Sequence, residues 1–208
     1  MTSQEVSAAI DTAFDIFQGL GVRPVLFGSL IGAAINGGFY REIGDIDLLA
    51  ERRHQNDIEN YFKNAGFEKY INKDIGLVAV LGCCPVEFSD GRHKFSFIFG
   101  NLKEDYFELP LKFGFSFRWP RKELSCNYEL EGRKFSGFSP EFYFLFLMIA
   151  EKKREKRKKD FAVVFKKINP NKLIETAGQD FIFWRGRPIT LFGKAQQLAV
   201  KWILKRNL

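Results

Sequence analysis

Apolar and polar side chains alternate in distinct rhythms along the first 66 residues, and the rhythm changes at glycines. Residues 5–19 have apolar positions three or four apart, which is typical of an amphipathic helix. Gly37 and Gly66 each follow a segment of this kind and predict where it ends. These patterns predict helices over 5–19, 29–36 and 55–65, and strands over 24–27 and 45–49.

Between Phe67 and Phe135 the apolar positions shift towards a period of two, which predicts strands. Turn-forming Gly, Pro and Asp residues separate the candidates. The predicted strands cover residues 77–81, 86–88, 95–99, 113–117 and 128–131. Residues 101–111 between them follow neither period, so the sequence assigns them no element.

Ser139-Pro140-Glu141 predicts a strong helix start: Ser is a favoured N-cap, Pro suits the first helical position, and an acid faces the positive helix end. The rest of the chain has a helical pattern, with breaks near residues 169–170 and 187–188. We therefore predict an α/β (α+β) protein with a mixed sheet flanked by helices. Residues 1–136 would form an α/β core and residues 137–208 a helical C-terminal region packed on it.

Composition limits the classes of protein that this chain can be. It has 208 residues, 46% of them hydrophobic, and 24 Phe, enough for a large aromatic core. No apolar run approaches the roughly 18–20 residues that span a bilayer, and the N-terminus has no signal-peptide pattern. The three Cys match no zinc or disulfide framework. These features predict a cytoplasmic protein with reduced thiols and no membrane partner, and leave its oligomeric state open.

The positive charge is concentrated in one segment. Residues 152–159 contain seven basic residues and one acid; subtracting them from the 32 basic and 25 acidic residues of the chain leaves 25 and 24. A partner that carries phosphate would meet one local patch rather than a basic surface. A solvated helix face is the alternative interpretation of such a run.

Three carboxylates are candidates for a metal site. Asp45 and Asp47 are two residues apart on a predicted strand, so both project from one face and repel each other unless a cation lies between them. Glu87 lies on another short apolar strand. If the strands bring the three together, they could hold one or two Mg²⁺ ions, which prefer oxygen ligands. Ordinary surface acids on an edge strand are the alternative for an isolated Asp-x-Asp.

Gly28 and Ser29 stand where a predicted strand ends and a predicted helix begins. The start of a helix presents free N–H groups and a positive dipole, which favour phosphate. Gly28 would permit close backbone approach, and the Ser29 hydroxyl could donate a hydrogen bond. A simple helix cap is the alternative.

The stretch from Leu26 to Leu49, with its Gly-Ser, Asp-x-Asp and a later acid at Glu87, resembles the nucleotidyltransferase superfamily. It is most similar to the small branch of aminoglycoside and lincosamide nucleotidyltransferases and the related toxin–antitoxin enzymes. That branch often has a basic residue before the Asp pair, which Arg41 matches, and a later Lys-bearing helix with a Lys-Asp pair. Lys153 and the pair at 159–160 match that helix. The acid that often follows three residues later is absent, since position 163 is Val.

A helical wheel that continues from Phe142 places Lys153, Lys156 and Asp160 on the stripe that packs inward, and Lys159 to the side. Because charges are rarely buried unpaired, this stripe should line a cleft. Lys153 would face nucleotide phosphates, and Asp160 would orient Lys153 or a neighbouring base. The arrangement requires an unbroken helix through residue 160.

The resemblance implies a nucleotidyltransferase fold and transfer of a nucleoside monophosphate from an NTP to an acceptor hydroxyl, with release of pyrophosphate. Asp45 and Asp47 would hold Mg²⁺, for which Mn²⁺ could substitute, and Glu87 would be a ligand or the base. Gly28 and Ser29 would bind the phosphates, and Arg41 and Lys153 would neutralise the leaving pyrophosphate.

The acceptor stays open between a small molecule, RNA and protein. The aromatic–basic cluster at Trp119 is a candidate acceptor contact. A non-catalytic nucleotide- or RNA-binding module on the same fold is the alternative to an enzyme.

Overall fold

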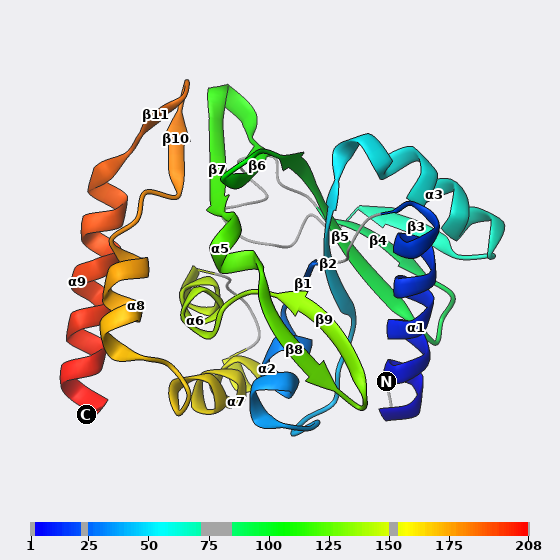
Figure 1. Ribbon diagram of the computed structural model, residues 1–208, viewed down its shortest axis with the longest axis horizontal. Coiled ribbons are helices and arrows are strands. Elements are labelled where there is room, and N and C mark those ends of the chain that lie inside the picture. The colour runs from blue at the N-terminus through cyan, green and yellow to red at the C-terminus, as the bar shows by residue number, and fades with distance from the viewer. Residues whose placement is uncertain (1–2, 22–24, 72–84, 150–153, 208) are drawn as a thin grey trace.

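A computed structural model describes residues 3–21, 25–71, 85–149 and 154–207 (Figure 1). Its helices are α1 (Ser3–Gly19), α2 (Ser29–Asn36), α3 (Gln55–Asn64), α5 (Arg121–Leu124), α6 (Pro140–Ile149), α7 (Arg154–Phe165), α8 (Pro170–Ala177) and α9 (Thr190–Asn207), with short 3₁₀ turns at 52–54 and 112–114. Its strands are β1 (Val25–Phe27), β2 (Ile46–Glu51), β3 (Glu68–Ile71), β4 (Val86–Ser89), β5 (Lys94–Leu102), β6 (Tyr106–Pro110), β7 (Phe115–Pro120), β8 (Cys126–Leu130), β9 (Arg133–Gly137), β10 (Ile182–Trp184) and β11 (Arg187–Pro188). No helix in these ranges is both long and apolar enough to cross a membrane.

One mixed sheet runs through the molecule, in the order β11-β10-β7-β6-β5-β2-β1-β9-β8 (Figure 1). Off this path, β4 pairs with the first half of β5, and β3 pairs with β4. The short β1 pairs antiparallel with β2 and parallel with β9. The long β5 pairs parallel with β2 and antiparallel with β4 and β6. The predicted mixed sheet with flanking helices is therefore confirmed.

The abundance of Phe is explained by the core. Phe62 of α3 is fully buried and stacks on Phe88 of β4, with ring centroids 4.5 Å apart, and it also contacts Phe95 and Phe97 of β5. These rings fasten α3 to the half of the sheet that contains β4. Because each buried aromatic ring removes a large apolar area from water, such a cluster strongly stabilises this packing.

Helix α6 packs through a second aromatic cluster. The ring centroids of Phe138 and Phe142 are 4.9 Å apart, and the Trp119 ring of β7 contacts both rings. Trp119 is only 7% exposed and also stacks on Phe107. The expectation that Trp119 contacts an acceptor substrate is therefore wrong, because its ring belongs to the core.

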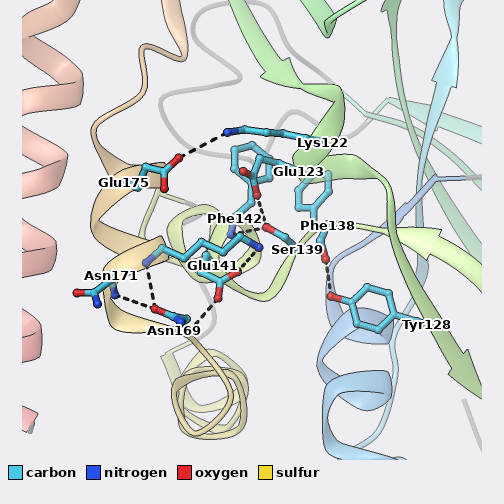
Figure 2. Close-up of polar contacts among 11 residues, drawn as sticks. Lys122, Glu123, Tyr128, Phe138, Ser139, Glu141, Phe142, Asn169, Asn171 and Glu175 are labelled. Atoms are coloured by element: carbon cyan, nitrogen blue, oxygen red, sulfur yellow. Dashed lines mark hydrogen bonds and ion pairs between the residues drawn. The ribbon is translucent and has the colours of Figure 1, made fainter.

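Polar contacts join the start of α6 to its surroundings (Figure 2). The Ser139 hydroxyl donates to the buried Glu123 of α5 and accepts from the Phe142 amide, which confirms Ser139 as the N-cap. The Glu141 carboxylate, also buried, accepts from the Asn169 amide at 2.9 Å and forms an ion pair with Lys172 of α8 at 3.0 Å. These contacts hold α5, α6 and α8 together.

Two expectations for the C-terminal region need correction. Residues 182–188 are not helical: β10 and β11 form a hairpin, and β10 extends the sheet by pairing with β7. The unbroken helix through residue 160 is also wrong. Phe144 of α6 contacts Phe161 of α7 with ring centroids 4.9 Å apart, which two residues 17 positions apart on one straight helix cannot do. The division into regions 1–136 and 137–208 stays a prediction.

Candidate active site

Gly28 lies directly against Asp47. Strand β1 ends at Phe27, whose register partner on β2 is Asp47, so the next residue, Gly28, turns beside that carboxylate. Gly28 has φ 71° and ψ −149°, a backbone region open almost only to glycine. A Cβ at this position would lie 1.9 Å from Asp47 Oδ2. Glycine is therefore required both by the backbone conformation and by the approach of the carboxylate.

Helix α2 begins immediately after this turn, at Ser29. Ser29 is 7% exposed, and Gly28, which stands at the N-cap position, has no side chain with which to cap the helix. The first turn also contains no acidic residue. The free N–H groups and the positive end of α2 are thus close to the Asp47 carboxylate.

Asp45 and Asp47 flank the first residue of β2, Ile46, which is fully buried together with Leu48. The alternation of polar and apolar residues predicted from the sequence is thus present, although Asp45 precedes the strand rather than forming part of it. The two carboxylates leave the chain on the side opposite the core residues and are only partly buried.

Glu87 stands at the same level of the sheet as Asp47. Ser96 of β5 is the register partner of Asp47 on one side and of Glu87 on the other. Side chains at one register level of adjacent strands project from the same face, so Asp47, Ser96 and Glu87 form a row. Strand β5 separates the strands of the two acids, which are therefore not direct neighbours.

Lys94 brings a positive charge into this row. Its Nζ lies 2.7 Å from Glu87 Oε2. Burial acts to lower the pKa of Lys94, but the hydrogen bond to Glu87 and the negative charges of Glu87, Asp45 and Asp47 raise it. The ammonium is therefore held in its charged form among carboxylates.

The pKa of Asp47 is raised well above its ordinary value. Burial is the largest cause, followed by the negative charges of Asp45 and Glu87; Lys94 and a hydrogen bond from Ser96 act in the opposite direction. The carboxylates are close enough to disfavour one another's charge, which is the condition that a bound cation relieves.

The three side chains match the chemistry of Mg²⁺. Carboxylate oxygens are its preferred protein ligands, and Gly28 leaves open the space beside Asp47 that a Cβ would fill. No group of three or more His, Cys, Asp or Glu in the described ranges is arranged to hold an ion as it stands. The three residues are thus of the ligand type that Mg²⁺ prefers, but the described residues do not form a ready-made ion site.

Arg41 and Asp160 form a buried ion pair. Arg41 Nε and Nη2 donate to the two carboxylate oxygens of Asp160 at 2.6 and 2.8 Å, and Tyr40 donates a further hydrogen bond. The Arg41 side chain is 10% exposed and that of Asp160 6%. Burial acts to lower the pKa of Arg41, but the bond to Asp160 raises it. This pair fixes the segment before Asp45 to α7.

Among the described residues of the basic segment, Lys156 comes near the candidate site. Lys156 is exposed, and its Nζ lies 4.0 Å from the position that a Cβ on Gly44 would take, next to Asp45. Lys159 is also exposed. Lys153, expected to face nucleotide phosphates, lies outside the described residues. A role for Lys156 at the nucleotide stays a prediction.

The sequence reasoning missed Lys94 and Ser96. Asp90-Gly91 was the available signal, because it marks a tight turn that places the first residues of β5 beside Glu87.

The fold is similar to those of known antibiotic-modifying enzymes. The lincomycin-bound lincosamide antibiotic adenylyltransferase LnuA matches with a TM-score of 0.63 and 18% identity, over 81% of this chain and 99% of that one. The crystal structure of ANT(2'')-Ia in complex with adenylyl-2''-tobramycin matches with a TM-score of 0.62 and 12% identity, over 98% and 99%. The solution structure of ANT(2'')-Ia matches with a TM-score of 0.61 and 11% identity, over the full length of both.

No protein-family model and no curated protein sequence matches the chain. The fold is therefore the level at which the similarity holds, and it is that of these lincosamide and aminoglycoside nucleotidyltransferases.

Proposed function

We propose that this protein is a Mg²⁺-dependent nucleotidyltransferase, which moves a nucleoside monophosphate from an NTP to an acceptor hydroxyl and releases pyrophosphate. The observation that carries the proposal is the position of Asp47: its carboxylate lies against Gly28 at the start of α2 and at one register level with Glu87. The start of a helix, which favours phosphate, and the acidic row therefore lie next to each other. The similarity of fold to two antibiotic nucleotidyltransferases supports the same reaction class.

The triphosphate would bind at the start of α2. The N–H groups of the first turn and the Ser29 hydroxyl would donate to its oxygens, and the helix dipole would favour the negative charge. Lys156, which reaches Gly44, would add positive charge on the other side of Asp45. Arg41 contributes indirectly, because its guanidinium is engaged by Asp160 and holds the segment before Asp45 in place.

Asp45 and Asp47 would hold the metal, with Glu87 as a further ligand or as the base; two ions, or Mn²⁺ in place of Mg²⁺, fit the same donors. When bound, the metal neutralises triphosphate oxygens and the negative charge that develops as pyrophosphate leaves. The acidic row would position the reactants: a hydroxyl that hydrogen-bonds to Glu87 would lie at the register level of Asp47, which is next to the start of α2.

In the transfer step the acceptor oxygen attacks the α-phosphorus and loses its proton to a carboxylate, for which Glu87 is the candidate. A new bond forms between that oxygen and the α-phosphorus, and the bond from the α-phosphorus to the oxygen that bridges to the β-phosphorus breaks. The electron pair leaves with pyrophosphate, whose charge the α2 helix start and Lys156 would stabilise.

The acceptor in our proposal is a small hydroxylated molecule, since the two structural neighbours are described with lincomycin and with adenylyl-2''-tobramycin. RNA and protein acceptors are the alternatives within the enzyme proposal. A non-catalytic nucleotide- or RNA-binding module is the alternative outside it; the presence of all three acids, Asp45, Asp47 and Glu87, favours an enzyme.

The test is incubation with each α-labelled NTP, Mg²⁺ and separate sets of lincosamide, aminoglycoside, tRNA and protein acceptors. We expect label transfer to one acceptor class, with pyrophosphate released in equal amount. The Asp45→Asn variant should lose transfer, whereas Asp57→Asn, an exposed acid on α3, should retain it. Nucleotide binding that needs no metal, without transfer to any acceptor, would favour the non-catalytic module.

A further inference from the structure

Lys94 lies beside the carboxylates of the candidate site. It is the first residue of β5, directly after the turn that joins β4 to β5, and its register partner is Ser89. From there its ammonium reaches back to Glu87 Oε2 at 2.7 Å. The Glu87 side chain is only 9% exposed, whereas that of Lys94 is 39% exposed. The glutamate is therefore held by the sheet, and part of the lysine faces solvent.

The charge on Lys94 acts on the whole acidic row. Besides its contact with Glu87, the ammonium interacts electrostatically with Asp45 and Asp47. Three carboxylates at one face would repel one another strongly without a cation. Lys94 supplies one positive charge at this place in the folded chain itself.

A lysine ammonium and a divalent cation cannot both remain in contact with Glu87 without repelling each other. At an effective dielectric constant of about 20, charges a few ångströms apart interact strongly, so the two cations compete for the same oxygen. The partly exposed lysine side chain has solvent on one side into which it can turn. Glu87 lies on a buried strand, and its side chain is only 9% exposed.

We infer that Lys94 is an internal counter-ion of the carboxylate site: its ammonium neutralises the row when no metal is bound, and it leaves Glu87 when a divalent cation binds there. The inference rests on the proposed function, since it assigns a metal to Asp45, Asp47 and Glu87. Lys94 is in this sense a positioning residue, because it holds the Glu87 carboxylate before a metal arrives. It also weakens metal binding, because each metal ion must displace an ion pair.

Two other roles for Lys94 predict different results. If the lysine stayed in place and bound the triphosphate, its removal would weaken nucleotide binding and leave the affinity for free metal unchanged. If it only stabilised the hairpin, its removal would lower the melting temperature without any change in metal affinity.

The experiment measures binding of Mn²⁺ alone, by calorimetry and by the loss of the free Mn²⁺ signal in electron paramagnetic resonance. Lys94→Met should bind Mn²⁺ at least about tenfold more tightly than the unaltered protein, the change that corresponds to one displaced interaction of about 1.4 kcal/mol. Lys94→Arg retains the cation and should stay close to the unaltered affinity. Lys94→Gln serves in place of Lys94→Met if that variant does not fold.

Lys69→Met is the matched control. Lys69 also pairs with a glutamate, at 2.6 Å from Glu59, and is similarly exposed at 43%, but it lies on β3 away from the acidic row. Its loss should leave Mn²⁺ affinity unchanged. In a second measurement, added Mg²⁺ should raise the melting temperature of Lys94→Met more than that of the unaltered protein, because the variant lacks the ammonium that contacts Glu87.

The outcomes separate this inference from the proposed function. If the unaltered protein and Lys94→Met both bind no Mn²⁺, the metal site itself is wrong. If both bind Mn²⁺ with equal affinity, or if Lys94→Met binds it more weakly, the metal site stands and the counter-ion role is overturned.

Discussion

At the scale of single residues, Gly28 links the two halves of the candidate site. Its backbone conformation carries the chain from β1 into α2, and its missing side chain admits the Asp47 carboxylate. We expect Gly28→Ala to lower the free energy of unfolding by about 2 kcal/mol, since alanine is strained in this backbone region. The Cβ must also displace Asp47, so transfer should fall by more than about a hundredfold. Thermal unfolding and a transfer assay measure the two effects.

Gly37→Ala is the control for strain alone. Gly37 has φ 79° at the end of α2, and a Cβ there would meet nothing within 4 Å. Alanine in the left-handed region should cost about 1 kcal/mol, with transfer retained. If Gly28→Ala kept full transfer, the contact between Gly28 and Asp47 would have no part in the chemistry.

At the scale of elements, the β4–β5 hairpin sets the position of Glu87 relative to Asp47. In its turn, Asp90 Oδ1 accepts from the amides of Arg92 and His93 at 2.8 and 2.6 Å. Burial acts to raise the pKa of Asp90, but the hydrogen bonds from His93 and Arg92 outweigh it and lower the pKa to about 2. The folded chain thus favours the charged form of this carboxylate.

The sign of the resulting pH dependence follows from that lowered pKa. The stabilisation is fully present above the ordinary pKa of 3.8 and is lost as the pH falls towards 2. Asp90→Ala should therefore lower the free energy of unfolding by about 1 kcal/mol at pH 6, after allowance for solvent screening, and by progressively less towards pH 2. Denaturant unfolding at several pH values tests this, and a pH-independent loss would contradict it.

The Arg41–Asp160 pair is a second link between elements, since it joins the segment before β2 to α7. Arg41→Met should cost about 3 kcal/mol of stability, because it leaves a buried carboxylate without its ion partner. Arg41→Met/Asp160→Asn should cost less than the sum of the two single changes. Urea unfolding of the four proteins measures this coupling. Additive, small stability losses with weakened NTP binding would instead support the phosphate-binding role expected from the sequence.

Local sequence patterns predict best the elements that contain their own start and stop residues. Helix α2 begins at Ser29 and ends at Asn36, as predicted, because Gly37 adopts the left-handed conformation that ends it. Strands β10 and β11 escaped prediction because they are short and because β10 is held by pairing with β7, far away in sequence, while β11 pairs only with β10 among the described residues. The turn between them contained a signal, Arg185-Gly186, with positive φ at both residues.

At the scale of the whole molecule, the sequence points to the acidic residues of the candidate site but not to the arrangement of charge around them. Asp47 and Glu87 are recognisable from the pattern of acids between apolar residues. Lys94 is not, because its role depends on the register of β4 with β5. The wheel that grouped Lys153 with Asp160 used a continuous helix, and the packing of α6 against α7 rules that geometry out.

Lys156 and Lys159 of the basic segment are both exposed but have different surroundings. Lys156 extends to Gly44 beside the acidic row, whereas Lys159 is exposed on the same helix. Lys156→Ala should weaken NTP binding about tenfold or more, because a charge-assisted contact to phosphate contributes about 1.5–3 kcal/mol. Lys159→Ala should leave NTP binding and transfer to a small acceptor unchanged. Fluorescence titrations of both variants with NTP at two salt concentrations measure the difference.

If the acceptor is RNA, Lys159→Ala should no longer be without effect. Lys159→Ala would then weaken RNA binding and reduce the slope of binding against salt by about one unit, because one phosphate contact is lost. Small, equal effects of both variants on NTP would mean that the segment is a solvated helix face. A large effect of Lys156→Ala on NTP binding, without any loss of RNA binding in Lys159→Ala, would mean that the basic segment acts on the nucleotide. That result would favour a small acceptor.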